Sequence, residues 1–398
     1  MKIGLIKEGK KPADNRVALT PGQCKLIQER YNQVKIIVQS STSRCFTDDE
    51  YRAEGIEVSN SVEDCDILLG IKEVPVSMLI PGKIYYFFSH TKKLQEHNRE
   101  MLQDIVRKDI TLIDYECLEH EDGTRILGFG FFAGVVGAHN GMMAYGKRTG
   151  AYQLQRVNGR SSLRDLIHTY FGLKIPPIKI AVTGSGRVAH GVLEIMNLLD
   201  IHEVEPEDFL ATKFTYPVYV HLKGEDLYGK KGIYSRQDFH ANAGQYFSKF
   251  KEFLPVTDIL INGIYWEKNI PRLFEMEDIS KPEFHIQTIA DITDDHNGSV
   301  PCNIGEGTIE DPVYGVDKVT HLLTAPYLPG SIDIMAVGNL PNELPRDSSA
   351  YFGEQLLKEV VEGMISGNSA TIEKATIVKK GKLTSRYSYM SEYAKSID

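Results

Sequence analysis

The fold of this chain is decided by the stretch Lys179-Ile180-Ala181-Val182-Thr183-Gly184-Ser185-Gly186-Arg187-Val188-Ala189-His190-Gly191. A short apolar run ends at a pair of glycines and an apolar helical pattern follows at once, which predicts a strand, a tight turn and a helix. Gly184, Gly186 and Ala189 have the spacing of a dinucleotide-binding turn. Gly184 permits the sharp turn, Gly186 lets backbone approach a pyrophosphate, and Ala189 keeps the helix close to the strand.

Nearly half of the 398 residues precede this turn, so another domain must occupy the first part of the chain. Short buried strands alternate with helical patterns throughout, which predicts an α/β fold of two Rossmann-like domains with parallel sheets around a central cleft. We expect a substrate or catalytic domain over 1–133, completed by 345–398, and a dinucleotide-binding domain over 134–344. An aromatic, lysine-rich segment near 211–252 reads as an insertion in the second domain.

Individual elements can be predicted from the apolar pattern. Strands are expected at 3–7, 35–39, 66–71, 83–88, 111–114, 179–183, 258–262, 288–292 and 332–337. Helices are expected near 21–31, 47–55, 75–80, 93–108, 128–150 and 347–364, the last packing back on the first domain.

The composition of the chain argues against several classes of function. Hydrophobic residues make up 42% and charged residues 25% of the chain, and the net charge of −9 argues against a nucleic-acid surface. No apolar run reaches the ~18 residues that span a membrane, and the first residues read as a strand and not as a signal peptide. The five cysteines include no C-x-x-C pair, and no histidine cluster indicates a metal site. We therefore expect a cytoplasmic enzyme with reduced thiols, and a monomer or a homodimer.

Charged side chains follow four of the expected strands in the first domain. Arg16 comes after the first strand, Lys72 after 66–71, His90 after 83–88 and Glu116 after 111–114. The carboxyl ends of parallel strands meet at one edge, where open α/β sheets bind ligands. Each residue alone has an ordinary structural explanation, but four together predict a cleft lined with acid and base groups.

Several motifs resemble a known family. Arg16-Val17-Ala18-Leu19-Thr20-Pro21 followed by Gly70-Ile71-Lys72-Glu73 resembles the alanine dehydrogenase and transhydrogenase superfamily. The segments 87–95, 112–116, 260–267 and 339–345 resemble saccharopine dehydrogenase (lysine-forming), and most of all the lysine-ketoglutarate reductase half of the bifunctional lysine-degrading enzyme. The aromatic segment at 211–252 also resembles that half. The similarity extends over essentially the whole chain.

This resemblance implies a reaction. The family joins the ε-amine of lysine to the ketone of 2-oxoglutarate, and hydride from a nicotinamide reduces the resulting imine to saccharopine. By resemblance, Lys72 and His90 are the acid/base pair and Glu73 and Glu116 are the carboxylates that tune them. The carboxylates of saccharopine require cations in the site, and the family positions for these are Arg16, Lys93 and Arg125.

The coenzyme is NAD or NADP. An acidic residue ~20 positions after the glycines usually holds the ribose hydroxyls, and Glu203 and Glu205, which fall there, favour NAD. The enzymes that the chain resembles use NADPH, and Arg187 is placed to approach a 2′-phosphate. The resemblance also assigns Asp291 a place near the nicotinamide. The expected coenzyme-binding set is Gly184, Ser185, Gly186, Arg187, Val188, Glu203, Glu205, Tyr265, Asp291, Asn339 and Leu340.

Three alternatives stay open. An alanine dehydrogenase would act on pyruvate and ammonia, but it would have no clear use for Arg125 and Lys93 together. A subunit of a membrane transhydrogenase would leave the substrate-binding matches idle. A protein without catalytic activity could sense NAD(P) or a metabolite, although Lys72, His90 and Arg16 are all present.

Overall fold

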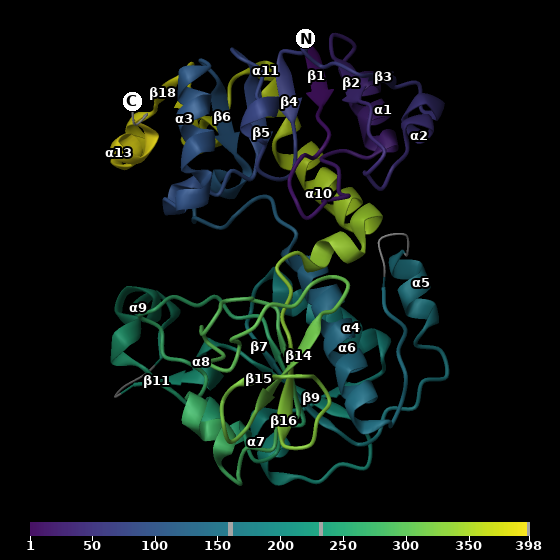
Figure 1. Cartoon of the computed structure of the whole chain (residues 1–398), viewed down its shortest axis with the longest axis vertical. Helices are drawn as coiled ribbons and strands as arrows, with labels where there is room; N and C mark the ends of the chain where they lie inside the picture. The colour runs from purple at the N-terminus through teal and green to yellow at the C-terminus, as the bar shows by residue number, and fades with distance from the viewer. Residues whose placement is uncertain (158–161, 231–233, 396–398) are drawn as a thin grey trace. The chain divides into compact units, whose positions relative to one another are not determined.

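The structure is a computed structural model that describes residues 1–157, 162–230 and 234–395. The chain forms two compact units, Met1–Phe129 with Pro345–Asp398, and Gly130–Leu344. Each unit is built on one eight-stranded, mostly parallel sheet with helices against it (Figure 1). The predicted α/β fold with Rossmann-like sheets is confirmed.

The sheet of the first unit has the order β18-β17-β6-β5-β4-β1-β2-β3. Its strands β1 to β6 are parallel, so their carboxyl ends lie along one edge. The strands are β1 (Lys2–Leu5), β2 (Lys35–Gln39), β3 (Glu57–Ser59), β4 (Ile67–Leu69), β5 (Ile84–Phe87), β6 (Thr111–Asp114), β17 (Thr376–Lys379) and β18 (Lys382–Leu383).

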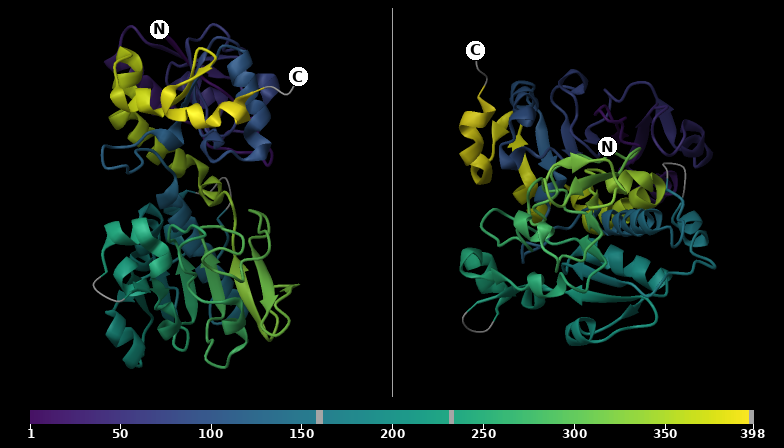
Figure 2. Two further views of the ribbon diagram at one scale, coloured as in Figure 1. Left: turned by 90° about the vertical axis from the view of Figure 1, so that its left-hand side faces the viewer. Right: turned by 60° about the horizontal axis from the view of Figure 1, so that its bottom comes forward.

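Helices from both ends of the chain complete this unit. The C-terminal segment, yellow in Figure 2, lies with the N-terminal strands and helices in the first unit. The helices are α1 (Pro21–Arg30), α2 (Asp48–Ala53), α3 (Arg99–Arg107), α10 (Pro345–Glu359), α11 (Val361–Ser366), α12 (Ala370–Ala375) and α13 (Ser391–Ala394). Short 3-10 turns are η1 (Val76–Met78), η2 (Thr91–Lys93), η3 (Glu96–Asn98), η4 (Tyr115–Cys117) and η9 (Ser385–Met390).

The sheet of the second unit has the order β15-β14-β16-β13-β12-β7-β9-β8. The strands are β7 (Lys179–Thr183), β8 (His202–Glu203), β9 (Val218–Leu222), β12 (Ile259–Asn262), β13 (Thr288–Asp291), β14 (Val313–Asp317), β15 (Leu323–Thr324) and β16 (Ser331–Met335). The helices and turns around them are α4 (Gly130–Thr149), α5 (Leu163–His168), α6 (Arg187–Leu198), α7 (Pro206–Ala211), η7 (Met276–Ser280) and η8 (Leu340–Glu343).

Antiparallel strands at one edge of each sheet were not expected. β17 pairs antiparallel with β6, and β14 pairs antiparallel with β16. The two sheets are therefore parallel, as predicted, except at these edges. Antiparallel strands cap otherwise parallel sheets in many α/β folds.

Close backbone packing joins α4 to α6, which lie side by side in the second unit (Figure 1). A Cβ on Gly134 would collide with the carbonyl of Val188, and one on Gly191 would collide with the carbonyl of Phe131. The small residues of the glycine-rich stretch 128–150 therefore serve this contact. It fixes α6, whose N-terminus follows the glycine turn.

The insertion is shorter than predicted. The range 211–252 includes β9, which is a strand of the main sheet, so the additional structure begins only after Leu222. It contains α8 (Gly224–Leu227), β10 (Tyr228–Gly229), α9 (Arg236–Asn242), η5 (Ala243–Gln245), β11 (Phe247–Ser248) and η6 (Phe250–Phe253). Residues 231–233 lie outside the described residues. Tyr228, Phe239 and Tyr246 form its small aromatic core.

A buried ion pair ties the end of α4 to β16. Nη1 of Arg148 donates to Oδ2 of Asp333 over 2.9 Å, and Nη2 donates to the carbonyl of Ser331 over 2.6 Å. Asp333 is fully buried and Arg148 keeps only 14% of its side chain exposed. Arg148→Ala would leave a buried carboxylate without its cation.

We expect Arg148→Ala to lower the free energy of unfolding by about 3–5 kcal/mol, as measured by urea denaturation. Arg148→Ala combined with Asp333→Ala should be less destabilised than Arg148→Ala alone, because both charges are then absent. Equal stability of the wild type and Arg148→Ala would contradict a structural role for the pair.

Candidate active site

The carboxyl edge of the first sheet brings together the charged residues predicted from the strand ends. Arg16 follows β1, Lys72 follows β4, His90 follows β5 and Glu116 lies in η4 after β6. Because β1, β4, β5 and β6 are neighbouring parallel strands, all four residues belong to one edge. This edge is the candidate active site of the first unit.

Lys72 is the candidate base. Burial lowers the pKa of its amine to about 8, with a further lowering from the charge of Arg16. Asp14 and Glu73 act in the opposite direction. A lysine with this pKa carries a neutral fraction near neutral pH, so it can accept a proton.

His90 and Glu73 form a pair beside Lys72. Nδ1 of His90 lies 2.7 Å from Oε1 of Glu73, and Lys10 donates from Nζ to Oε2 of Glu73 over 2.8 Å. Burial alone would raise the pKa of Glu73, but the hydrogen bonds from His90 and Lys10 outweigh it and hold the pKa at about 2. Glu73 is therefore an ionised partner that fixes the imidazole ring, which also stacks on Phe88.

Arg16 is buried, with 3% of its surface exposed. Its Nε donates to Oδ1 of Asp14 over 2.9 Å, and Nη2 pairs with Oδ2 of Asp14 over 2.5 Å. Its guanidinium also lies 4.1 Å from the ring centre of Phe129. These contacts hold the planar cation at the edge of the sheet, with its Nε and Nη2 side paired to the carboxylate of Asp14.

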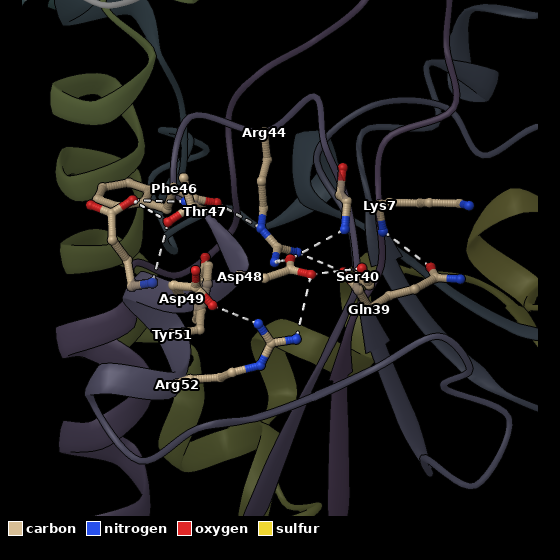
Figure 3. Close-up of polar contacts among 12 residues, drawn as sticks. Lys7, Gln39, Ser40, Arg44, Phe46, Thr47, Asp48, Asp49, Tyr51 and Arg52 are labelled. Atoms are coloured by element: carbon tan, nitrogen blue, oxygen red, sulfur yellow. Dashed lines mark hydrogen bonds and ion pairs between the residues drawn. The ribbon is translucent and has the colours of Figure 1, made fainter.

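A polar cluster around Arg44 supports the loop that carries Arg16 (Figure 3). Arg44 donates from Nε to the carbonyl of Phe46 over 2.8 Å and from Nη1 to the carbonyl of Gln39 over 2.6 Å, and it pairs with Asp48. The next residue, Cys45, donates its N–H to the carbonyl of Asn15 over 2.7 Å. The Arg44 cluster thus anchors the backbone directly before Arg16.

Glu116 is buried and paired with two cations. Nη2 of Arg125 donates to Oε1 of Glu116 over 2.6 Å, and Nζ of Lys92 lies 4.0 Å from the same oxygen. Lys93 is exposed and has no ion pair among the described residues. Lys92, which the sequence analysis did not single out, thus lies beside Glu116, and the predicted substrate contact Lys93 lies exposed in the same turn.

The glycine turn of the second unit has the conformation that its sequence predicts. Gly184 has a φ of +108°, and a Cβ there would lie 2.6 Å from the carbonyl oxygen of Gly263. Gly186 is exposed, and a Cβ there would meet nothing within 4 Å. Gly186 is also the N-cap of α6 and offers the first turn no side-chain oxygen. The open space over Gly186 and the helix N-terminus fit the pyrophosphate of a dinucleotide.

The other predicted residues of the turn differ in how far they are buried. Ser185 is exposed beside Gly186, while Val188 is half-buried and packs against Gly263. Arg187 is the first residue of α6. Val188 therefore contributes packing, and Ser185 and Arg187 lie at the surface over which a ligand would pass.

The acidic residues expected at the ribose lie elsewhere. The strand beside β7 is β9, whereas Glu203 belongs to β8 at the sheet edge. Glu203 pairs in register with Tyr219, which pairs with Ile180, three residues before Thr183 ends β7. Glu205, the N-cap of α7, comes directly after this strand. The structure thus does not bring Glu203 or Glu205 to the glycine turn. Their spacing from the glycines would place them there only if β8 paired with β7, but β9 lies between these two strands.

The end of β9 takes that position instead. Leu222 pairs with Thr183, and Nε2 of His221 lies 2.7 Å from the carbonyl oxygen of Gly184. Lys223 follows, with an exposed side chain. His221 and Lys223 were missed, although an apolar strand ending before them is visible in Val218-Tyr219-Val220.

Asp291 lies in a buried network at the ends of β7, β12 and β13. Its Oδ1 accepts from Nδ2 of Asn262 over 2.9 Å, and its Oδ2 accepts from Nδ2 of Asn303 over 2.9 Å. Thr183 donates to Oδ1 of Asn262 over 2.7 Å. Burial raises the pKa of Asp291 despite these bonds. Asp291 therefore organises the strand ends, and the carboxylates accessible from solvent are those of Asp294 and Asp295 in the following loop.

The remaining predicted coenzyme contacts differ in exposure. Tyr265 is 66% exposed and Leu340 only 2%. Leu340 packs against α4 at Gly137, and Asn339 begins η8, where its carbonyl accepts from the N–H of Asn342 over 3.0 Å. Leu340 is thus a packing residue of η8, whereas Tyr265 and Asn339 remain at the surface of the unit.

Within residues 1–157, 162–230 and 234–395, no group of three histidine, cysteine or acidic side chains is arranged to hold a metal ion. No helix in the described part of the chain is both long and apolar enough to cross a membrane.

Comparisons with known proteins agree on the fold. An L-alanine dehydrogenase structure matches with a TM-score of 0.67 at 16% identity, covering 99% of this chain and 100% of that one. A transhydrogenase from Sinorhizobium meliloti matches with a TM-score of 0.60 at 16% identity, covering 96% of this chain and 98% of that one.

Sequence relatives extend over nearly all of the chain. The mitochondrial alpha-aminoadipic semialdehyde synthase of Rattus norvegicus is 30% identical over 99% of this chain, and an alpha-aminoadipic semialdehyde synthase of Arabidopsis thaliana is 29% identical over 99%. The chain spans 48% and 42% of these two relatives' lengths. A saccharopine dehydrogenase [NAD(+), L-lysine-forming] of Emericella nidulans is 28% identical over 91% of this chain and 92% of its own length.

The family model of the alanine dehydrogenase/PNT N-terminal domain matches residues 4–136. This match includes Arg16, Lys72, His90 and Glu116. Residues 4–136 are therefore similar to the alanine dehydrogenase/PNT N-terminal domain, and the sequence relatives of the chain include saccharopine dehydrogenases (L-lysine-forming) and alpha-aminoadipic semialdehyde synthases.

Proposed function

We propose that this protein is an NAD(P)-dependent oxidoreductase that interconverts L-lysine plus 2-oxoglutarate and saccharopine. The observation that carries the proposal is the edge of the first sheet, where Lys72, the His90–Glu73 pair and the buried Arg16 occur together. The relatives named saccharopine dehydrogenase support it.

The reaction makes two demands on proton transfer. The ε-ammonium of lysine must lose a proton before it attacks the ketone, and the hydroxyl of the resulting carbinolamine must gain one before water leaves. Lys72, with its lowered pKa, is suited to accept the first proton. His90, held by Glu73, is suited to donate to the leaving oxygen. A bound reduced nicotinamide supplies hydride to the imine.

Cations must also receive the carboxylates of the substrates. Arg16 offers a buried, oriented guanidinium, and Arg125 is 49% exposed while paired to Glu116. Lys92, beside Glu116, is a third cation near the same strand ends. Several cations suit a tricarboxylate product better than alanine, which carries one carboxylate.

We propose NADP(H) as the preferred coenzyme. The strand beside β7 is β9, which ends at Leu222 between His221 and Lys223 and carries no acidic side chain that could bind the ribose hydroxyls. Arg187 follows the glycine turn directly. A cation beside the ribose favours a 2′-phosphate, whereas a carboxylate would repel it.

Lys223→Ala is expected to raise the KM for NADPH by about tenfold while changing the KM for NADH little, because a charged contact to the 2′-phosphate is lost. Steady-state kinetics with each coenzyme measure this. Lys213→Ala, which removes an exposed lysine before β9, is the matched control. An equal rise in the KM for NADPH and the KM for NADH in Lys223→Ala would show that Lys223 does not contact the 2′-phosphate.

The reaction itself is tested by following the absorbance of the reduced nicotinamide. NADH and NADPH are tried separately with lysine plus 2-oxoglutarate and with pyruvate plus ammonia. The proposal predicts oxidation that requires lysine and 2-oxoglutarate together. Activity only with pyruvate and ammonia would make the protein an alanine dehydrogenase. Coenzyme binding without turnover in any combination would favour a sensor.

A further inference from the structure

One half-buried carboxylate beside the candidate base has no role in the chemistry above. Glu8 follows β1 and reaches the loop after β4, where its Oε1 accepts from the N–H of Ile71 over 2.7 Å and its Oε2 accepts from the N–H of Lys72 over 2.9 Å. Both carboxylate oxygens thus hold one short stretch of backbone. That stretch carries the side chain of Lys72.

We propose that Glu8 is a positioning residue for Lys72, and that its ionised carboxylate clamps the Ile71–Lys72 backbone so that the lysine amine is held at the edge of the sheet. The inference rests on the proposed function only in giving Lys72 a catalytic task. The clamp itself can be tested without turnover.

The geometry requires a carboxylate. Two neighbouring N–H groups point at one side chain, so both of its oxygens must accept. A protonated carboxyl or a glutamine amide would turn a donor toward one of the two N–H groups, and that bond would be lost. Aspartate keeps the charge but is one methylene shorter. The clamp therefore depends on both the length and the ionisation of the side chain.

The surroundings of Glu8 make this ionisation sensitive to pH. Burial raises its pKa to about 7, the charge of Asp14 raises it further, and the backbone hydrogen bonds and Arg16 lower it. The clamp is therefore complete above this pH and loosens as the pH falls through it. The titratable and charged groups that face Glu8 or line its narrow cavity are Lys7, Asp14, Arg16, Arg44, Tyr51, Lys72 and Tyr115.

The direct test is the amide resonance of Ile71 in protein labelled with ¹⁵N-isoleucine and assigned by its loss in Ile71→Val. We expect its proton shift to titrate with a midpoint near 7 in the wild type and to lose this titration in Glu8→Gln. Lys72→Met should keep the titration, which separates Glu8 from the amine of Lys72. Glu57→Gln, which removes an exposed carboxylate of the same sheet, is the matched control.

Kinetics give the second readout. Glu8→Gln should lower kcat by about 10- to 100-fold with little change in the KM for coenzyme, and the acid side of the pH profile should change shape. Glu8→Asp should also lose kcat, although it keeps the charge. A wild-type Ile71 amide that does not titrate, or one that titrates equally in Glu8→Gln, would overturn the proposal. Absence of lysine-dependent turnover would instead overturn the proposed function and leave the amide titration intact.

Discussion

Replacing Lys72 with methionine is expected to lower kcat by about 10²–10⁴-fold, the usual contribution of one general acid or base. Methionine keeps most of the length of the lysine stem and removes the amine. The residue belongs to the first unit, whereas the glycine turn belongs to the second, so the Kd for coenzyme should stay at the wild-type value. Stopped-flow turnover and coenzyme fluorescence titration measure the two quantities.

The pH profile makes this test more specific. Burial lowers the pKa of Lys72 to about 8, so the neutral amine is present above this pH and lost below it. The dependence of kcat/KM on this ionisation should vanish in Lys72→Met. Lys35→Met, which removes an exposed lysine at the start of β2, is the control and should keep normal turnover. Near-normal turnover in Lys72→Met would refute the assignment of the base.

Replacing Gly186 with valine is expected to raise the Kd for coenzyme by about 100-fold while leaving the melting temperature nearly unchanged. A Cβ at Gly186 would meet nothing in the protein within 4 Å, and its φ of −94° suits any residue. The new methyl groups would instead occupy the space through which a pyrophosphate approaches the N-terminus of α6. Calorimetric titration and thermal unfolding measure the two effects.

Gly184→Val supplies the contrast. Gly184 has a φ of +108° and would press a Cβ against the carbonyl of Gly263, so this variant should lose both coenzyme binding and stability. A loss of coenzyme affinity without a loss of stability indicates a glycine needed for ligand binding, whereas a loss of both indicates a glycine needed for the fold. Wild-type coenzyme affinity in Gly186→Val would mean that no dinucleotide phosphate lies over this turn.

The parts of the site that the sequence predicted are those set by local pattern. Lys72, His90 and Glu116 each follow a short apolar run, and parallel strands bring their carboxyl ends to one edge whatever their order. The glycine turn was equally predictable, because the positive φ at Gly184 is a conformation that only glycine adopts without cost, and Gly186 and Ala189 follow it at the spacing of a dinucleotide-binding turn.

The parts that it did not predict depend on tertiary pairing. Glu203 has the expected spacing from the glycines, but β9 pairs with β7 and moves β8 to the sheet edge. Neighbours in the chain cannot reveal which strand takes that place. The environment of Asp291 was not predictable for the same reason. Its carboxylate accepts hydrogen bonds from Asn262 and Asn303, which come from separate segments of the chain. Lys92 and Lys93 are adjacent, and only the turn of η2 decides which one approaches Glu116.

The most direct test of the central claim is the fate of hydride. The protein is incubated with lysine, 2-oxoglutarate and reduced coenzyme carrying deuterium at the transferred position of the nicotinamide, and the products are analysed by mass spectrometry and NMR. The account predicts saccharopine with deuterium on the carbon that was the ketone carbon of 2-oxoglutarate, formed only when lysine is present. Deuterium found only in alanine when pyruvate and ammonia are supplied, or no transfer to any lysine-derived product, would contradict it.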